Sequence, residues 1–317
     1  MTTTSPTARR SSAQSSPPRR TSSVRRRTPQ AWLFLAPFVI FYAAFMVGPT
    51  IWMVVASFFN TSTVRAGLGS FAGLDNYIEM FSRDDFWSSL WHTLQFTLYT
   101  VPPLVLLSFV LAVLTNRAAR GQWFFRLAFF LPFILPSATI SLIWVFVFTP
   151  STGLWSLPAR LLGLEAGDGV LSDPRTAMIC IAIATIWWTI GFNFVLYLAG
   201  LQEIPRQLYE AAAVDGASSW QQIRSVTIPL LARTTALVIL LQIIASLKIF
   251  DQVYLMTQGG PGNSTQVALG LITDTAFTDN RIGAASAASV LLFLIIIVIA
   301  IVQQLISRAG AKREEVS

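Results

Sequence analysis

The sequence contains few charged residues, one cysteine and one histidine. Charged residues make up 12% of the 317 positions and hydrophobic residues 54%, whereas a soluble globular domain carries about 25% charged residues. This shortage of charge argues against an ordinary soluble protein and indicates that lipid is the main solvent. The single Cys180 excludes an internal disulfide bond, and the single His92 excludes a multi-histidine metal site. We therefore expect no metal site and no catalytic residues.

Acidic residues are absent from the first 27 positions. Without this tail the chain is almost neutral, so the net charge of +7 does not indicate a nucleic-acid-binding surface. We expect residues 1–28 to be a disordered cytoplasmic tail, because they contain almost nothing apolar to bury. The tail fits a topology determinant near anionic lipid, and a nucleic-acid or regulatory role is the alternative. Its seven arginines are Arg9, Arg10, Arg19, Arg20, Arg25, Arg26 and Arg27.

Six long apolar runs predict an all-α polytopic membrane protein. About 20 apolar residues cross the roughly 30 Å hydrocarbon layer of a bilayer. The first run is too long for a signal peptide, and we expect Pro37 and the Gly48-Pro49 pair to kink it. The transmembrane domain is predicted over residues 29–309, with a C-terminal tail at 310–317. The expected spans are Ala31–Phe59, Thr93–Leu114, Phe124–Phe148, Ala177–Leu201, Leu231–Ile249 and Ile282–Ile306.

The distribution of charge in the connecting segments predicts the orientation. Lysine and arginine in short flanks favour the cytoplasmic side. Basic residues occupy the N-terminal tail, the 115–123 loop (Arg117, Arg120, and Arg126 just beyond it) and the C-terminus (Arg308, Lys312, Arg313). The opposite loops carry acids. Both termini are therefore expected in the cytoplasm. The acids are Asp75, Glu79, Asp84, Asp85, Glu165, Asp168 and Asp173.

The cytoplasmic segment 202–230 is much longer than a simple helical hairpin requires. Pro205 suits the first turn of a helix over residues 206–214, and Gly216 suits its left-handed C-terminal cap. A second helix is expected to begin with a capping box, formed by Ser218 with Gln221 or by Ser219 with Gln222, and to end at Pro229. Such a hairpin can receive mechanical force from a soluble partner, or it can lie flat on the lipid surface. The residues of the hairpin do not decide between these two interpretations.

Part of this hairpin resembles the EAA loop of binding-protein-dependent ABC importer permeases. In that family the loop forms a coupling helix that docks into a cleft on the ATPase subunit. The residues that carry the resemblance are Glu210-Ala211-Ala212, Gly216 and Ile228-Pro229. The resemblance implies a type I importer permease fold. It also implies an ATPase-coupling set consisting of Glu210, Ala211, Ala212, Asp215, Gly216, Ile228 and Pro229.

Further motifs are similar to the carbohydrate-uptake, MalF-like branch of that family. They cover nearly the whole chain from about residue 30, but the large periplasmic insertion of the maltose permease is missing, which argues against a maltose assignment. The chain resembles a compact six-span permease. The motifs are Gly73-Leu74-Asp75-Asn76-Tyr77, Phe86-Trp87, Leu171-Ser172-Asp173-Pro174, Phe250-Asp251, Tyr254, Thr257, Gly259-Gly260-Pro261 and Ser264-Thr265.

The resemblance implies partners and a location. It implies a second permease subunit, usually a different chain, two ATPase subunits that bind ATP and Mg²⁺, and an extracytoplasmic solute-binding protein in the bacterial cytoplasmic membrane. The chain has no phosphate-binding GxxxxGK[ST] loop of its own, so the energy must come from these partners. A sugar is the favoured solute, with glycerol 3-phosphate or glycerophosphodiesters as the alternative.

Polar and aromatic residues in spans four and five are candidates for contact with a hydroxyl-rich solute, although helix packing explains the same residues. Lys248 and Asp251 would share one helical face if the helix persisted, so an intrahelical pair or snorkelling to the interface competes with solute or gate contact. The candidates are Trp187, Trp188, Thr189, Asn193, Gln242, Ser246, Lys248, Asp251 and Gln252.

Two glycine-rich or small-residue segments complete the prediction. Gly259-Gly260-Pro261 breaks any helix, and it serves either as an external loop or gate or as an ordinary turn. The small residues from Gly283 to Ser289 allow close helix packing, for which the second permease is a candidate partner.

Two other function classes compete with the importer. A secondary transporter normally carries acidic or histidine relays near the midplane, and an intramembrane enzyme needs a nucleophile and base at depth. Neither pattern is evident in the sequence. A channel would not need the long cytoplasmic hairpin.

Overall fold

The computed structural model describes residues 29–65, 67–117, 121–150, 152–154, 156 and 169–314. The predictions for residues 1–28, for Arg120 and for the acids Glu165 and Asp168 lie outside these residues. The chain divides into two compact units, Met1–Thr50 and Ile51–Ser317, which we describe separately.

The first unit contains helix α1 (Pro29–Tyr42), the π-helical turn η1 (Ala43–Val47) and the start of α2 (Gly48–Ala56). Pro37 lies inside α1 without ending it. The Gly48 N–H donates to the carbonyl of Ala43, five residues back, so the turn is widened just before Pro49. Residues Phe34–Ala56 form one apolar helical span.

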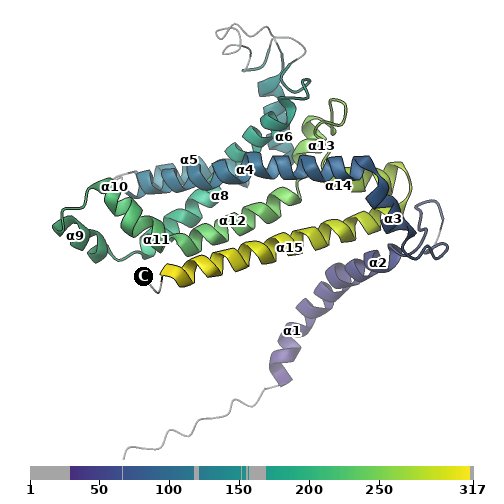
Figure 1. Ribbon diagram of the computed structural model, residues 1–317, viewed down its shortest axis with the longest axis horizontal. Helices are drawn as coiled ribbons and strands as arrows, with labels where there is room; N and C mark the ends of the chain where they lie inside the picture. Colours follow the sequence, from purple (N-terminus) through teal and green to yellow (C-terminus); the bar gives the residue numbers. More distant parts are fainter. Residues whose placement is uncertain are drawn as a thin grey trace, which may run out of the picture. The chain divides into compact units, whose positions relative to one another are not determined.

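The second unit is a helical bundle built around two long helices, α4 (Asp84–Arg117) and α8 (Ala177–Glu203). They pack along each other, α5 (Gln122–Ile134) packs on α8, and α12 (Ala232–Leu247) packs on α4. Helix α15 (Ile282–Glu314) packs on α12, so α12 lies between α4 and α15 (Figure 1). The buried residues between α4, α8 and α12 include Phe194, Tyr197 and Val238.

The bundle has two different ends (Figure 1). At the hairpin end lie α9 (Arg206–Val214), α10 (Ser219–Gln222), η2 (Ile223–Thr227) and α11 (Ile228–Leu230). At the loop end lie α3 (Asp75–Ser82), α14 (Ala268–Thr273) and η3 (Asp274–Thr278), while α13 (Asp251–Met256) packs on α6 (Ser137–Phe148). Among the described residues the only β pairing is an isolated bridge between Phe59 and Phe71.

Four described helices are long and apolar enough to cross a membrane, and two bent helix pairs bring the possible number to six. The prediction of six spans therefore holds if each bent pair counts as one span. The third span is not the straight helix that was expected over Phe124–Phe148. It consists of α5 and α6, which meet at 97°. Leu135 is extended (ψ 143°), as expected for the residue before Pro136.

The fifth span is also bent, and the position of the bend differs from the prediction. The helix passes through Pro229 in α11, and the chain turns at Leu231, where the two arms meet at 65°. The preceding π turn explains why Pro229 does not end the helix. The Ile228 N–H donates to the carbonyl of Ile223, five residues back, and this wider turn accommodates a proline that lacks its own N–H.

The small residues at the start of α15 pack against the chain's own loop. A Cβ on Gly283 would lie 2.0 Å from the Phe59 carbonyl oxygen, and the Gly283 N–H donates to the Thr61 carbonyl at 3.0 Å. Ala284 and Ala288 belong to a buried cluster with Met80 of α3, Phe86 of α4 and Leu271 of α14. The predicted close packing is present, and within this chain it is made with the loop end.

Candidate functional site

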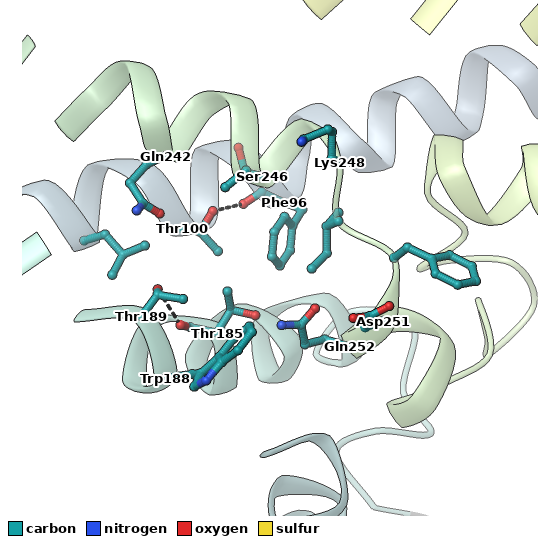
Figure 2. A pocket seen from close by; sticks show the side chains of 14 residues that line it. Phe96, Thr100, Thr185, Trp188, Thr189, Gln242, Ser246, Lys248, Asp251 and Gln252 are labelled. Carbon is teal, nitrogen blue, oxygen red and sulfur yellow. Dashed lines mark hydrogen bonds between the residues drawn. The ribbon is translucent and has the colours of Figure 1, made fainter. Parts of the chain in front are cut away.

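A pocket of about 190 Å³ lies inside the bundle between α4, α8, α12 and the start of α13 (Figure 2). We call it the bundle pocket. Seven of the nine predicted solute-binding residues line it, although they come from separate elements. These seven are Trp188, Thr189, Gln242, Ser246, Lys248, Asp251 and Gln252.

The other two predicted residues do not line the bundle pocket. Trp187 points to a different face of α8, where its ring lies edge-on against Trp144 with centroids 5.9 Å apart. Asn193 is fully buried behind the pocket wall, where its Oδ1 accepts a hydrogen bond from Gln242 Nε2 at 2.9 Å. Within the described residues the Asn193 Nδ2 has no partner. Asn193 therefore positions the Gln242 side chain and links α8 to α12.

Lys248 and Asp251 do not share one helical face, because the helix does not persist between them. Helix α12 ends at Leu247, and Phe250 has an extended φ of −147° before α13 begins at Asp251. The two side chains extend in different directions in Figure 2, and no ion pair joins them among the described residues. Ser137 instead donates to Asp251 Oδ2 at 2.7 Å, which joins the start of α6 to the pocket wall.

Most hydroxyl protons around the pocket are already used within their own helices. Thr100, Thr185 and Thr189 each donate to the carbonyl four residues back, at 2.8 to 2.9 Å. Their oxygens keep lone pairs that can accept hydrogen bonds from a ligand. No hydrogen bond within the described chain engages the Lys248 ammonium or the Gln252 amide. The pocket therefore offers both acceptors and donors beside aromatic rings.

The wall from α4 was missed by sequence reasoning. Phe96, Thr100 and Leu104 line the pocket, and they lie in a span that contains no charge between Asp85 and Arg117. A signal was present, because buried hydroxyl residues recur along one face of α4. Ser89, Thr93, Thr97 and Thr100 follow one another at spacings of three or four, and Ser108 follows eight residues after Thr100.

The hairpin at the other end is capped as its sequence predicts. Gly216 has a left-handed φ of +80°, and the following Ala217 N–H donates to the Ala212 carbonyl at 2.9 Å. Ser218 and Gln221 form a reciprocal capping box, which decides between the two alternatives. No atom lies within 4 Å of a Cβ placed on Gly216, so this glycine serves the backbone conformation and not packing.

The hairpin is joined to the bundle by a side chain of α4, and its two arms are joined to each other. Arg117 at the end of α4 donates to the Ser219 carbonyl at 3.2 Å, and the Tyr209 hydroxyl of the first arm lies 3.0 Å from the Thr227 hydroxyl of the second. A cavity of about 590 Å³ lies between the hairpin and the bundle, and Arg206 and Glu210 line it.

Most of the predicted coupling residues lie on the hairpin surface. Glu210, Ala211, Asp215, Gly216 and Ile228 are exposed, while Ala212 and Pro229 are half-buried. Large apolar side chains are exposed beside them, the most exposed being Val214 at 88% and Trp220 at 68%. A surface with this composition is typical of a contact with another protein.

The predicted gate residues Gly259, Gly260 and Pro261 lie in the turn between α13 and α14. Gly259 has a φ of +83°, and the Gly260-Pro261 bond is cis. The Thr265 N–H donates to the Gly259 carbonyl at 3.0 Å and its hydroxyl to the Gly260 carbonyl at 2.8 Å. The turn is thus closed by its own hydrogen bonds. A role as a gate stays a prediction.

Charged residues at the loop end form local ion pairs. Arg281, just before α15, pairs with Glu79 of α3 through two hydrogen bonds. These bonds lower the pKa of the Glu79 carboxyl, and burial opposes the shift. Arg83 pairs with Asp85 in the same way.

Comparison with known proteins assigns the architecture to a family. Residues 105–310 match the family of binding-protein-dependent transport system inner membrane components. The matched segment includes the hairpin and the pocket walls contributed by α8 and α12. The chain belongs to this family. It is therefore a multi-pass inner membrane component, the permease subunit of an ABC importer.

Relatives of this permease extend over most of its length. A probable ABC transporter permease of Pyrococcus horikoshii is 36% identical over 262 residues, which are 82% of this chain and 89% of that protein. The sulfoquinovosyl glycerol transport system permease of Agrobacterium fabrum is 36% identical over 258 residues, 81% and 83% of the two chains.

A solved structure shares the fold of the permease. A chain of the bacterial alginate ABC transporter, solved with its alginate pentasaccharide-bound periplasmic protein, superposes with a TM-score of 0.77 at 23% identity. It covers 90% of this chain and 96% of that one. This likeness supports the type I permease fold expected from the sequence.

Proposed function

We propose that this permease moves a sugar from an external binding protein to the cytoplasm through the bundle pocket. Transport would occur by alternating access, with a second and different permease chain and two ATPase subunits. The observation that carries the proposal is the composition of the pocket. Trp188 and Phe96 provide aromatic faces, while threonine hydroxyls, the Gln252 amide and the Lys248 ammonium provide hydrogen bonds.

The pocket chemistry suits a neutral, hydroxyl-rich solute. Sugar hydroxyls both donate and accept, which matches a site with free lone pairs and free donors. The relatives are consistent with this class, because one is named for trehalose and maltose transport and another for lactose transport. Glycerol 3-phosphate is the second candidate, since the Lys248 ammonium has no ion-pair partner in the described chain and would suit a phosphate.

The hairpin supports the coupling role. A capped pair of short helices transmits displacement better than a flexible loop, and Arg117 ties it to α4, whose middle lines the bundle pocket. We assign the ATPase-facing surface to Glu210, Ala211, Asp215, Gly216 and Ile228, with Ala212 and Pro229 supporting it. ATP and Mg²⁺ would bind the partner ATPases, whose closure moves the hairpins and opens the pocket outward.

The orientation follows from the basic residues. Arg117 and Arg126 lie near the hairpin end, whereas Asp75, Glu79 and Asp84 lie at the loop end. We therefore place the hairpin end and both termini in the cytoplasm and the loop end outside.

The test is sugar uptake by the complete importer, purified with its partners and reconstituted in liposomes. Labelled maltose, trehalose, lactose, sulfoquinovosyl glycerol and sn-glycerol 3-phosphate, solutes of related systems, form the panel. Gly216→Pro and Glu210→Lys should abolish uptake but leave membrane insertion intact. A proline cannot adopt the φ of +80° at position 216.

Gly67→Ala is the matched control for Gly216→Ala. Both glycines have a positive φ with nothing within 4 Å of a new Cβ, so both substitutions carry the same backbone strain of about 1–2 kcal/mol. Only the hairpin variant should lower uptake per ATP hydrolysed. Normal uptake in Glu210→Lys and Gly216→Pro would overturn the coupling role. If the importer takes up glycerol 3-phosphate and none of the sugars, the substrate is a glycerol phosphate and not a sugar.

A further inference from the structure

A second, smaller cavity lies at the loop end between α13 and α14. Its volume is about 170 Å³, and Phe250 forms part of its wall as well as part of the wall of the bundle pocket. The two cavities therefore share one lining residue. The proposed orientation places the smaller cavity on the outer side, where a solute released by the binding protein would arrive first.

One wall of this outer cavity is aromatic. The rings of Phe250 and Tyr254 are stacked, with centroids 5.3 Å apart and planes at 23°. Tyr254 is 51% exposed although it lines the cavity, so part of its ring is available for contact. An aromatic ring with a polar hydroxyl at its edge suits a ligand that is apolar on one face and polar at its rim.

The opposite wall is polar and held in place. Gln266 Nε2 donates to Asp274 Oδ2 at 2.7 Å, and the Gln266 carbonyl lies 3.1 Å from His92 Nδ1. Gly259 makes room for this arrangement, because a Cβ there would lie 2.0 Å from Gln266 Oε1. Among the described residues no hydrogen bond is made to the other carboxyl oxygen of Asp274, which leaves an acceptor at the cavity.

This combination matches one ring of a carbohydrate. The C–H face of a sugar ring packs on an aromatic side chain, and its hydroxyls donate strong hydrogen bonds to a carboxylate. The cavity is smaller than the roughly 300–1,000 Å³ of pockets that enclose a drug-sized ligand, so its size suits a single ring.

We propose that the cavity between Tyr254 and Asp274 is an outer sugar subsite. It holds one ring of the solute between release from the binding protein and entry into the bundle pocket. The proposal rests on the proposed function, because it takes the solute to be a sugar, and it adds a site that lies outside the bundle pocket.

Gly270 allows the subsite to be filled without removing a polar group. It lines the cavity from α14, and a Cβ there meets the Gln266 side chain at an ordinary 3.5 Å. In the reconstituted importer with its loaded binding protein, Gly270→Ala, Gly270→Val and Gly270→Leu should lower sugar uptake progressively with side-chain size. ATP hydrolysis stimulated by the loaded binding protein should continue. Thr273→Leu adds bulk on the same helix outside the cavity and is the matched control.

If the Gly270→Leu complex does not assemble, substitutions in the polar and aromatic walls test the outer subsite instead. Asp274→Asn should lower uptake about ten-fold, because it weakens a hydrogen bond to a charged acceptor. Tyr254→Phe should keep more uptake than Tyr254→Ala, since it keeps the ring.

The outcomes separate the two proposals. Unchanged uptake in Gly270→Leu, or in Asp274→Asn and Tyr254→Ala where the leucine variant fails to assemble, would overturn the outer subsite while the sugar function stands. If the wild-type importer takes up no sugar of the panel, the proposed function itself fails.

Discussion

At the scale of the residue, Trp187 and Trp188 have different surroundings although they are neighbours in sequence. Trp188 lines the bundle pocket, and its indole N–H donates to the Leu135 carbonyl at 3.2 Å. Trp187 is the preceding residue, yet its ring packs on Trp144 outside the pocket. Successive helix positions differ by 100° in direction, so adjacent residues face different partners.

Trp188→Phe is expected to reduce sugar uptake, and Trp187→Phe is expected to leave it nearly unchanged. The first substitution frees the Leu135 carbonyl beside the bend between α5 and α6. A net hydrogen bond is worth about 1 kcal/mol, or about a five-fold effect on an equilibrium. Initial uptake rates in proteoliposomes measure both variants. Equal losses in the two variants would contradict the separation of their roles.

At the scale of the element, α3 and the start of α15 are joined by the ion pair of Glu79 and Arg281. The segments lie about 200 positions apart in the sequence, and the pair fixes the loop end of the bundle. Both side chains are more than a third exposed, so solvent weakens the pair.

The Glu79–Arg281 pair predicts a pH-dependent part of the stability. The pKa of Glu79 is lowered from 4.5 in the folded protein, so the stabilisation is present above the unfolded-state value and is lost as the pH falls through the lower folded-state value. The exposed pair is worth at most about 1 kcal/mol. Glu79→Gln and Arg281→Gln should each lower the melting temperature at pH 7.

The same melting measurement, repeated as the pH is lowered stepwise into the acid range, gives the control. Once the pH has fallen through the lowered pKa of Glu79, the protonated side chain no longer pairs, so the difference between wild type and Glu79→Gln should shrink. A difference that does not change over the whole acid range would show that the pair does not titrate as described.

The bent helices also belong to the scale of the element, and the sequence predicted them incompletely. The bend at Leu135–Pro136 follows the known restriction on a residue before proline. Pro229 instead lies within a helix. The preceding π turn Ile223–Thr227 is wider than an α-helical turn and accommodates a proline, which has no N–H to donate. Local sequence shows where a helix is weakened, but the packing of neighbouring elements decides whether it bends.

At the scale of the whole molecule, the orientation of the permease can be tested by cysteine labelling. In a Cys180→Ala background, Phe277→Cys places a thiol at the exposed loop end and Val214→Cys places one on the exposed hairpin. A membrane-impermeant maleimide should label the first in intact spheroplasts and the second only after permeabilisation. Labelling of Val214→Cys in intact spheroplasts would reverse the proposed topology.

The amino-acid sequence by itself determined the helical class, the number of apolar runs and the capped hairpin. These depend on short-range physics: apolar length against bilayer thickness, a left-handed glycine at position 216, and the capping box of Ser218 and Gln221. The family also followed from the local motifs of the hairpin. Seven pocket residues were found because polar groups are rare in apolar spans.

The tertiary structure alone decided which polar residues share a cavity. It placed Asn193 behind Gln242, separated Lys248 from Asp251 and brought the α4 wall with Phe96 and Thr100 to the pocket. It also placed Phe250 in the walls of both the bundle pocket and the outer cavity. These relations depend on where helices end and how they rotate against one another. Those features are set by packing between segments far apart in the sequence, which no local pattern records.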